Sequence, residues 1–154
     1  YGPGGCPAFC KPWISRACPG YQALRGRGAH FALGGGYHLG VIPRFMEQYV
    51  YPELSEVKWT ETMAERKTLL REGTCAVVAL PGGIGTLDEL IETFALIHLK
   101  QYFGKIMVLD HNGFYAPLKS LLEHYVAKGM LSEETRSKMH FAHTVEELLD
   151  LLED

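Results

Sequence analysis

The sequence has no run of apolar residues that approaches the roughly 20 residues needed to cross a bilayer as a helix. Its first residues also lack the basic and then apolar order of a secretory signal peptide. We therefore expect a cytoplasmic protein that does not engage a membrane. Apolar residues make up 47% of the chain and charged residues 21%, close to the average for globular proteins, which argues against disordered and fibrous classes.

Spacings typical of metal and disulfide sites are absent as well. The four cysteines show no paired C-x-x-C spacing, and the seven histidines show no H-E-x-x-H spacing. Cys75 lies in an apolar run, where a buried thiol is common. We expect no disulfide, no zinc and no other metal.

Acidic residues are missing from the first part of the chain, which has no Asp or Glu before Glu47. A basic segment can contact phosphate groups, but scattered single cations are also typical of a solvated surface. Because the whole chain has a net charge of −3, nucleic acid is not an expected partner. The cations in this segment are Lys11, Arg16, Arg25, Arg27 and Arg44.

The apolar pattern predicts an α/β fold. A chain of 154 residues fits a single domain that buries roughly 70% of its unfolded surface. Gly and Pro interrupt residues 1–28, where no element is predicted. Strand and helix then alternate, which is typical of a Rossmann-like, doubly wound parallel sheet. The expected strands cover 29–33, 74–80, 105–109 and 138–143. The first expected helix runs from 60 to Gly73, the second begins at 87 and has about three turns, and the third covers 115–128. A last helix is expected after Thr144, which forms a capping pattern with Glu147.

One short connection conflicts with this pattern. Only three residues separate Gly34-Gly35-Gly36 from the apolar stretch that begins at Gly40. A crossover between parallel strands needs a dozen or more residues. We therefore predict that a segment is missing between Gly36 and Gly40, or that the backbone is irregular before about residue 40.

The loop at 81–89 has the sequence Pro-Gly-Gly-Ile-Gly-Thr-Leu-Asp-Glu and connects a predicted strand to a predicted helix. Such a junction offers free backbone N–H groups and the positive end of the helix dipole to a phosphate. It also lies beyond the carboxyl end of a strand, where ligands bind in α/β sheets. The loop lacks the Gly-Lys-Ser/Thr of a P-loop and the last glycine of the dinucleotide fingerprint, so it indicates a phosphate site of another kind.

This loop, together with Met63-Ala-Glu-Arg66-Lys67 upstream, closely resembles the LOG ("lonely guy") family. These are cytokinin riboside 5′-monophosphate phosphoribohydrolases, formerly labelled lysine decarboxylases. The resemblance covers about residues 29–154, including 34–36, 40–43 and 112–115. It implies a homodimeric hydrolase without a cofactor that cleaves the N-glycosidic bond of an adenosine 5′-monophosphate, N6-substituted or plain, and releases free base and ribose 5-phosphate. A non-catalytic nucleotide-binding or carrier protein of the same fold is the alternative, because a fold and a phosphate loop do not establish chemistry.

The resemblance implies that Arg66 and Glu89 are the catalytic pair. A carboxylate beside the ribose can stabilise the positive charge that develops as the bond breaks, or activate water. An arginine can hold a phosphate or carboxylate with two hydrogen bonds. The family also has a substrate-contacting glutamate after the segment at 40–43, and the resemblance places it at Glu47 or Glu53. The remaining substrate-binding residues implied are Lys67, Gly82, Gly83, Ile84, Gly85, Thr86, Leu87, Asp88, Gly35 and Gly36.

Structural alternatives stand beside these roles. Thr86 and Glu89 have the spacing of a capping box, in which Glu89 would only satisfy the start of the helix. Arg66 and Lys67 are also typical of a solvated helix end. We expect replacement of Arg66 by Ala to remove activity while it affects stability no more than a surface substitution does. His98 is interpreted as a core or interface histidine, and no local feature indicates a pyridoxal phosphate site.

Overall fold

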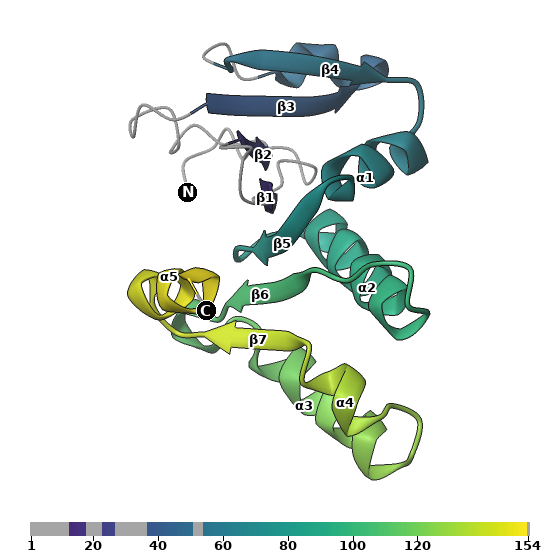
Figure 1. Cartoon of the computed structure of the whole chain (residues 1–154), viewed down its shortest axis with the longest axis vertical. Coiled ribbons are helices and arrows are strands. Elements are labelled where there is room, and N and C mark those ends of the chain that lie inside the picture. The colour runs from purple at the N-terminus through teal and green to yellow at the C-terminus, as the bar shows by residue number, and fades with distance from the viewer. Residues whose placement is uncertain (1–12, 18–22, 27–36, 51–53, 154) are drawn as a thin grey trace.

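The structure is a computed structural model that describes residues 13–17, 23–26, 37–50 and 54–153 (Figure 1). Seven strands and the helices that follow them alternate along most of this length. In chain order the elements are β1 Trp13–Ala17, β2 Ala23–Gly26, β3 Tyr37–Pro43, the 3-10 helix η2 Arg44–Tyr49, β4 Glu56–Thr60, α1 Met63–Arg71, β5 Thr74–Ala79, α2 Ile84–His98, β6 Lys105–Leu109, the 3-10 helix η3 His111–Gly113, α3 Ala116–Ala127, α4 Glu133–Arg136, β7 Met139–Ala142 and α5 Val145–Glu153.

The strands form one sheet in the order β4-β3-β2-β1-β5-β6-β7. Strand β1 runs antiparallel to both of its neighbours, β2 and β5, whereas every other neighbouring pair is parallel. The predicted α/β fold is therefore confirmed, with one antiparallel strand inside the sheet. That strand comes from the Gly- and Pro-rich segment in which the sequence predicted no element.

Helices cover the two faces of the sheet, and the burial of β5 follows this arrangement. Val77 and Ala79 belong to the core that includes residues of α1, α2 and α3, whereas Ala76 and Val78 pack with Leu148 of α5. Figure 1 shows α1, α2 and α3 on one side of the strands and α5 on the other. Because successive side chains of a strand point to opposite faces, a strand covered on both faces is a continuous apolar run, as the sequence predicted for this segment.

Two predicted helix boundaries, the end of α1 and the start of α5, are confirmed, whereas α2 begins at Ile84 rather than at Leu87. Helix α1 ends just before Gly73, whose φ of +66° is the left-handed conformation that glycine adopts without strain. At the start of α5, Thr144 Oγ1 accepts a hydrogen bond of 3.2 Å from the backbone N–H of Glu147. The Glu147 carboxylate in turn accepts one of 2.7 Å from the backbone N–H of His143. Side chains therefore satisfy backbone donors at the start of α5, as the capping pattern predicted.

Strand β3 is continuous from Tyr37 to Pro43, so the backbone has no break between Tyr37 and Gly40. Gly34, Gly35 and Gly36 lie outside the described residues, as does the strand expected at 29–33. The segment expected to be missing next to Gly36 therefore stays a prediction.

The described residues also bear on the expectations about membrane helices, metal sites and cysteines. Within the ranges given above, no helix is long and apolar enough to cross a membrane. The same residues contain no group of three or more His, Cys, Asp or Glu side chains that could hold a metal ion. Cys75 forms no disulfide within the described residues, while Cys6, Cys10 and Cys18 fall in the part of the chain that the structure does not describe.

Candidate functional site

The loop at 81–83 connects the carboxyl end of β5 to the start of α2. Gly83 is the N-cap of α2 and has an extended backbone. The first hydrogen bond of the helix runs from the N–H of Thr86 to the carbonyl oxygen of Gly83, at 2.9 Å. The N–H groups of Ile84 and Gly85, in the first turn, therefore have no acceptor within the helix and are directed beyond its start. This geometry confirms the predicted strand, loop and helix, and it is suited to an anion.

Glu89 does not cap α2. The helix begins at Ile84, two residues before Thr86, so Glu89 lies in the second turn. The N-cap residue is Gly83, so no side chain caps the start of the helix. The capping-box interpretation of Thr86 and Glu89 is therefore wrong, because their spacing falls inside the helix rather than at its first residue.

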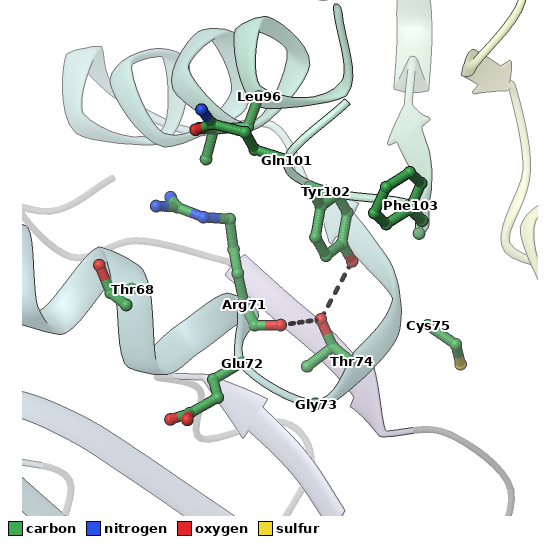
Figure 2. Close-up of a pocket in the computed structure, with 11 residues that line it drawn as sticks. Thr68, Arg71, Glu72, Gly73, Thr74, Cys75, Leu96, Gln101, Tyr102 and Phe103 are labelled. Atoms are coloured by element: carbon green, nitrogen blue, oxygen red, sulfur yellow. Dashed lines mark hydrogen bonds between the residues drawn. The ribbon is translucent and has the colours of Figure 1, made fainter. Parts of the chain in front are cut away.

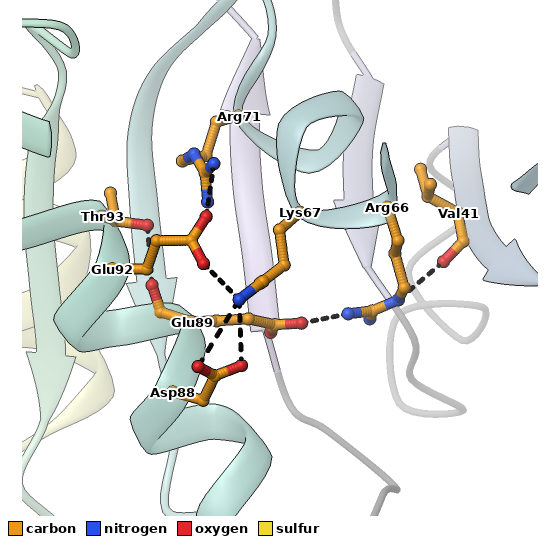
Figure 3. A network of polar contacts seen from close by, with 8 residues as sticks. All are labelled: Val41, Arg66, Lys67, Arg71, Asp88, Glu89, Glu92 and Thr93. Atoms are coloured by element: carbon orange, nitrogen blue, oxygen red, sulfur yellow. Dashed lines mark hydrogen bonds and ion pairs between the residues drawn. The ribbon is translucent and has the colours of Figure 1, made fainter. Parts of the chain in front are cut away.

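Arg66 and Glu89 form a buried ion pair between α1 and α2 (Figure 3). Arg66 Nη1 donates to Glu89 Oε1, and Arg66 Nε donates to the carbonyl oxygen of Val41 in β3 at 3.0 Å. The two charged side chains are 5% and 1% exposed. The solvated-helix-end interpretation of Arg66 is therefore wrong. Its burial also removes the physical reason for expecting that Arg66→Ala affects stability no more than a surface change. Removing one partner leaves the other charge buried without compensation.

The first turn of α1 sets the direction of Arg66. Thr62 is the N-cap, and its Oγ1 accepts a hydrogen bond of 3.1 Å from the backbone N–H of Glu65. The Glu65 carboxylate accepts one of 3.4 Å from the N–H of Thr62, which completes a capping box. The helix is therefore fixed at its first turn, and the next residue, Arg66, faces α2.

Lys67 lies beside this pair in a second group of ions. Its Nζ is 3.2 Å from Asp88 Oδ2 and also pairs with Glu92, which in turn lies 2.8 Å from Arg71 Nη2 (Figure 3). Burial by itself would lower the pKa of Lys67, but the hydrogen bonds and charges of Glu92 and Asp88 outweigh it and raise that pKa above 10.5. Lys67 and Asp88, both implied to bind substrate, are thus in contact with each other, and Lys67 is held as an ammonium ion.

The other implied substrate-binding residues divide into buried and exposed positions. Thr86 is fully buried, and its hydroxyl has no hydrogen-bond partner among the residues that the structure describes. Gly85 is buried next to it, whereas the side chains of Ile84 and Leu87 are exposed. Glu47 is exposed on η2, after the end of β3. Gly35 and Gly36 fall outside the described ranges, and Glu53 does too.

Tyr115 and Asp110 are two site residues to which the sequence assigned no role. The Tyr115 hydroxyl donates to the carbonyl oxygen of Leu80 at 2.8 Å, and the Tyr115 backbone N–H donates to Asp110 Oδ1 at 2.6 Å. Burial raises the pKa of Tyr115 to about 12, while a hydrogen bond from the backbone of Gly82 acts in the opposite direction. The phenol therefore contacts the chain on both sides of Pro81. Both residues follow β6, the position at which a strand delivers side chains to the carboxyl edge of the sheet.

Two cavities open at opposite edges of the sheet. One, of about 640 Å³, lies at the amino ends of β5 and β6 (Figure 2). Two of its hydroxyl groups are already hydrogen-bonded, since Thr74 Oγ1 donates to the carbonyl oxygen of Arg71 at 2.7 Å and lies 3.0 Å from the Tyr102 hydroxyl. The other, of about 580 Å³, lies at the carboxyl ends of β6 and β7 and is lined by Asp110 and His143 among others. The general rule for ligands in α/β sheets favours the carboxyl edge.

Comparison with known proteins gives a consistent result. The sequence model of a family described as "Possible lysine decarboxylase" matches residues 24–152. The chain is 36% identical over 138 residues to the cytokinin riboside 5′-monophosphate phosphoribohydrolase LOG of Oryza sativa subsp. japonica, an alignment that covers 88% of this chain and 57% of the relative. It is 34% identical over 127 residues to the phosphoribohydrolase of the same name from Rhodococcoides fascians, covering 80% and 64% of the two chains. For the Mycobacterium marinum relative the identity is 33% over 120 residues, covering 75% and 63%.

The alignments reach most of this chain but only part of each relative. The chain spans about half to two thirds of the length of the curated relatives it matches. The family model nevertheless covers residues from β2 to α5 and includes the loop at 81–89, Arg66 and Glu89. The chain therefore belongs to the family described as "Possible lysine decarboxylase", which includes the LOG phosphoribohydrolases that its loop resembles.

Proposed function

We propose that this protein binds a nucleoside 5′-monophosphate at the carboxyl edge of the sheet and hydrolyses its N-glycosidic bond. The relatives named above are phosphoribohydrolases that act on cytokinin riboside 5′-monophosphates. The observation that carries the proposal is the buried contact between Arg66 on α1 and Glu89 on α2. It joins the two residues that the family resemblance marks as catalytic, although they stand 23 positions apart in the sequence.

The start of α2 supplies the proposed phosphate site. The N–H groups of Ile84 and Gly85 are directed beyond the helix, and the positive end of a 15-residue helix dipole lies at the same point. Thr86 adds a buried hydroxyl without a partner in the described part of the chain. Because buried polar groups in proteins are almost always hydrogen-bonded, this hydroxyl supports a ligand oxygen at the site.

Glu89 is the proposed partner of the reacting ribose. As the bond from C1′ to the base breaks, its electron pair moves to the base and positive charge develops on the ribose ring. A carboxylate can stabilise that charge or take a proton from the attacking water, whose oxygen bonds to C1′ while a proton reaches the departing base.

A decarboxylase mechanism, as the family description suggests, does not suit the lysine of this site. Decarboxylases of this kind form a Schiff base through a neutral lysine amine and pyridoxal phosphate. Activation of such a lysine requires a lowered pKa. The contacts of Lys67 with Asp88 and Glu92 raise its pKa instead. The charge environment of Lys67 therefore disfavours Schiff-base chemistry at this residue.

The proposal is tested by incubating the protein with AMP, its N6-isopentenyl analogue and the matching nucleosides, followed by chromatography of the free base. Release from the monophosphates alone is the expected result. Equal release from the nucleosides would contradict the phosphate site, and binding of monophosphates without any release would favour the non-catalytic carrier.

Glu89→Gln tests the catalytic residue. The amide can still accept a hydrogen bond from Arg66 but has no negative charge for the ribose. Base release is expected to fall at least about a hundredfold, the lower range for one positioned acid-base group, while nucleotide binding persists. Glu61→Gln is the matched control, because Glu61 also pairs with an arginine but is 70% exposed. Unchanged turnover in Glu89→Gln would remove the catalytic assignment.

We also propose that the protein forms a homodimer through α2. Ile84, Leu87 and Ile91 are 69%, 36% and 40% exposed and lie at the i, i+3 and i+7 positions of one helix face. An exposed apolar stripe of this kind is typical of an interface. Multi-angle light scattering of the protein and of Ile91→Glu is expected to give a dimer and a monomer respectively. A monomeric parent protein would contradict the proposal.

A further inference from the structure

Tyr115 joins three strand ends at the carboxyl edge of the sheet. Its hydroxyl donates to the carbonyl oxygen of Leu80, directly after β5, at 2.8 Å. Its backbone N–H donates to the carboxylate of Asp110, directly after β6, at 2.6 Å. The N–H of Asp110 donates in turn to the carbonyl oxygen of Ala142, the last residue of β7, at 2.7 Å. The side chain of Tyr115 is 5% exposed, so the phenol is held inside the fold.

The phenol also contacts the glycine-rich loop itself. The backbone of Gly82 hydrogen-bonds to the Tyr115 oxygen, so this oxygen contacts the chain before and after Pro81. The two glycines that follow Pro81 have wide conformational freedom, and only the proline ring limits the loop locally. A fixed contact on each side of Pro81 removes much of that freedom before a ligand arrives. Preorganisation of this kind increases affinity because less motion is lost on binding.

We propose that Tyr115 is a positioning residue for the loop at 81–83, which it holds so that the N–H groups of Ile84 and Gly85, in the first turn of α2, meet the substrate phosphate. This inference rests on the proposed function, since it assigns the phosphate of a nucleoside monophosphate to the start of α2. Tyr115 acts through the loop and does not touch the reacting bond. Its hydroxyl therefore affects the binding of phosphate-containing ligands and leaves the chemical step nearly unchanged.

Tyr115→Phe tests this role because it removes the hydroxyl and keeps the ring packing. The KM for the monophosphate is expected to rise about tenfold, which corresponds to one net hydrogen bond, while kcat changes by less than about threefold. The Kd of ribose 5-phosphate, measured by calorimetry, is expected to rise by a similar factor. Tyr125→Phe is the matched control, because Tyr125 lies on α3 and is 47% exposed. A merely structural role would lower the active fraction and hence kcat, without changing the Kd of the folded protein.

A second variant keeps the hydroxyl but removes the contact that fixes the Tyr115 backbone. Asp110→Ala is expected to raise KM in the same direction as Tyr115→Phe. Both variants are assayed below their melting temperatures. Unchanged KM and unchanged ribose 5-phosphate affinity in both would overturn the positioning role.

The outcome also separates this inference from the proposed function. If the parent protein binds ribose 5-phosphate but releases no base, the proposed hydrolysis fails, and the Kd of Tyr115→Phe still decides the positioning role. If the parent protein binds no ribose 5-phosphate, the phosphate site at α2 and the positioning role are both overturned. If base release is intact and only the Kd and KM effects are missing, the positioning role alone is wrong.

Discussion

The Arg66–Glu89 pair allows stability and activity to be separated in one set of variants. We consider Arg66→Met, Glu89→Leu and the double variant. Each single change leaves a charge buried without its partner, and breaking a buried pair in this way costs about 3–5 kcal/mol. In a protein of this size such a loss lowers the melting temperature by roughly 6–20 °C.

The double variant is expected to be more stable than either single variant. Replacing both ions of a buried pair by apolar side chains of similar volume is often neutral or stabilising. One cost remains, because the carbonyl oxygen of Val41 loses the hydrogen bond donated by Arg66 Nε, worth about 1–3 kcal/mol. The double variant should therefore lose about 1–3 kcal/mol, well below the roughly 6–10 kcal/mol sum of the two single changes.

The assay is urea unfolding of the four proteins, with base release measured on the same samples. Arg44 and Glu61 provide the control pair, since their ions lie 2.9 Å apart but the side chains are 64% and 70% exposed. An exposed pair is expected to contribute less than about 1 kcal/mol. Additive losses at Arg66 and Glu89 would refute the assignment of a coupled buried pair. A double variant that is stable and still active would refute their catalytic roles.

Two further predictions concern single residues. Burial raises the pKa of Tyr115 from 10.0 to about 12, so the folded protein holds the phenol proton more tightly than the unfolded chain does. The protonated phenol therefore contributes fully to the free energy of unfolding below about pH 10, and this contribution is lost as the pH rises to about 12. The melting temperature of Tyr115→Phe should fall less steeply over that interval than that of the parent, and an equal slope would contradict the prediction. Gly73→Ala should cost about 1–2 kcal/mol in urea unfolding, because φ at this position is +66° and an added Cβ meets nothing within 4 Å, so that only backbone strain remains. An alanine variant as stable as the parent protein would show that the turn relaxes.

The part of the fold that could be predicted is the part with local signals. From Thr60 onward, the spacing of apolar residues and the positions of glycines predicted the strands and the longer helices, because each of these elements has one characteristic period of burial. The short helix α4 was not predicted. Strands β1 and β2 could not be predicted in the same way. They lie among Gly and Pro residues, and the pairing of β1 with β5 depends on contacts about 60 positions apart in the sequence.

The site divides in the same way. The glycine-rich loop between β5 and α2 could be predicted, because its glycines and its position between strand and helix are local features. The burial of Arg66 could not, because an arginine beside a lysine is usually solvated, and its partner Glu89 lies on the next helix. The contact of Tyr115 with Leu80 spans 35 positions and leaves no signature in either segment.

The charges on α1 and α2 also explain how an acidic helix could accept the phosphate that we propose binds at its start. Helix α2 carries three carboxylates on its second and third turns, and by themselves they would repel an anion at the helix start. Helix α1 places three cations against these carboxylates as ion pairs. In one of these pairs, Arg66 with Glu89, both side chains are buried. The opposing charges balance within the network, so the N–H groups and the dipole at the start of α2 remain as the uncompensated positive field. The interface between the two helices thus stabilises the fold and leaves the proposed anion site positive at the same time, through Arg66, Lys67 and Arg71 on one side and Asp88, Glu89 and Glu92 on the other.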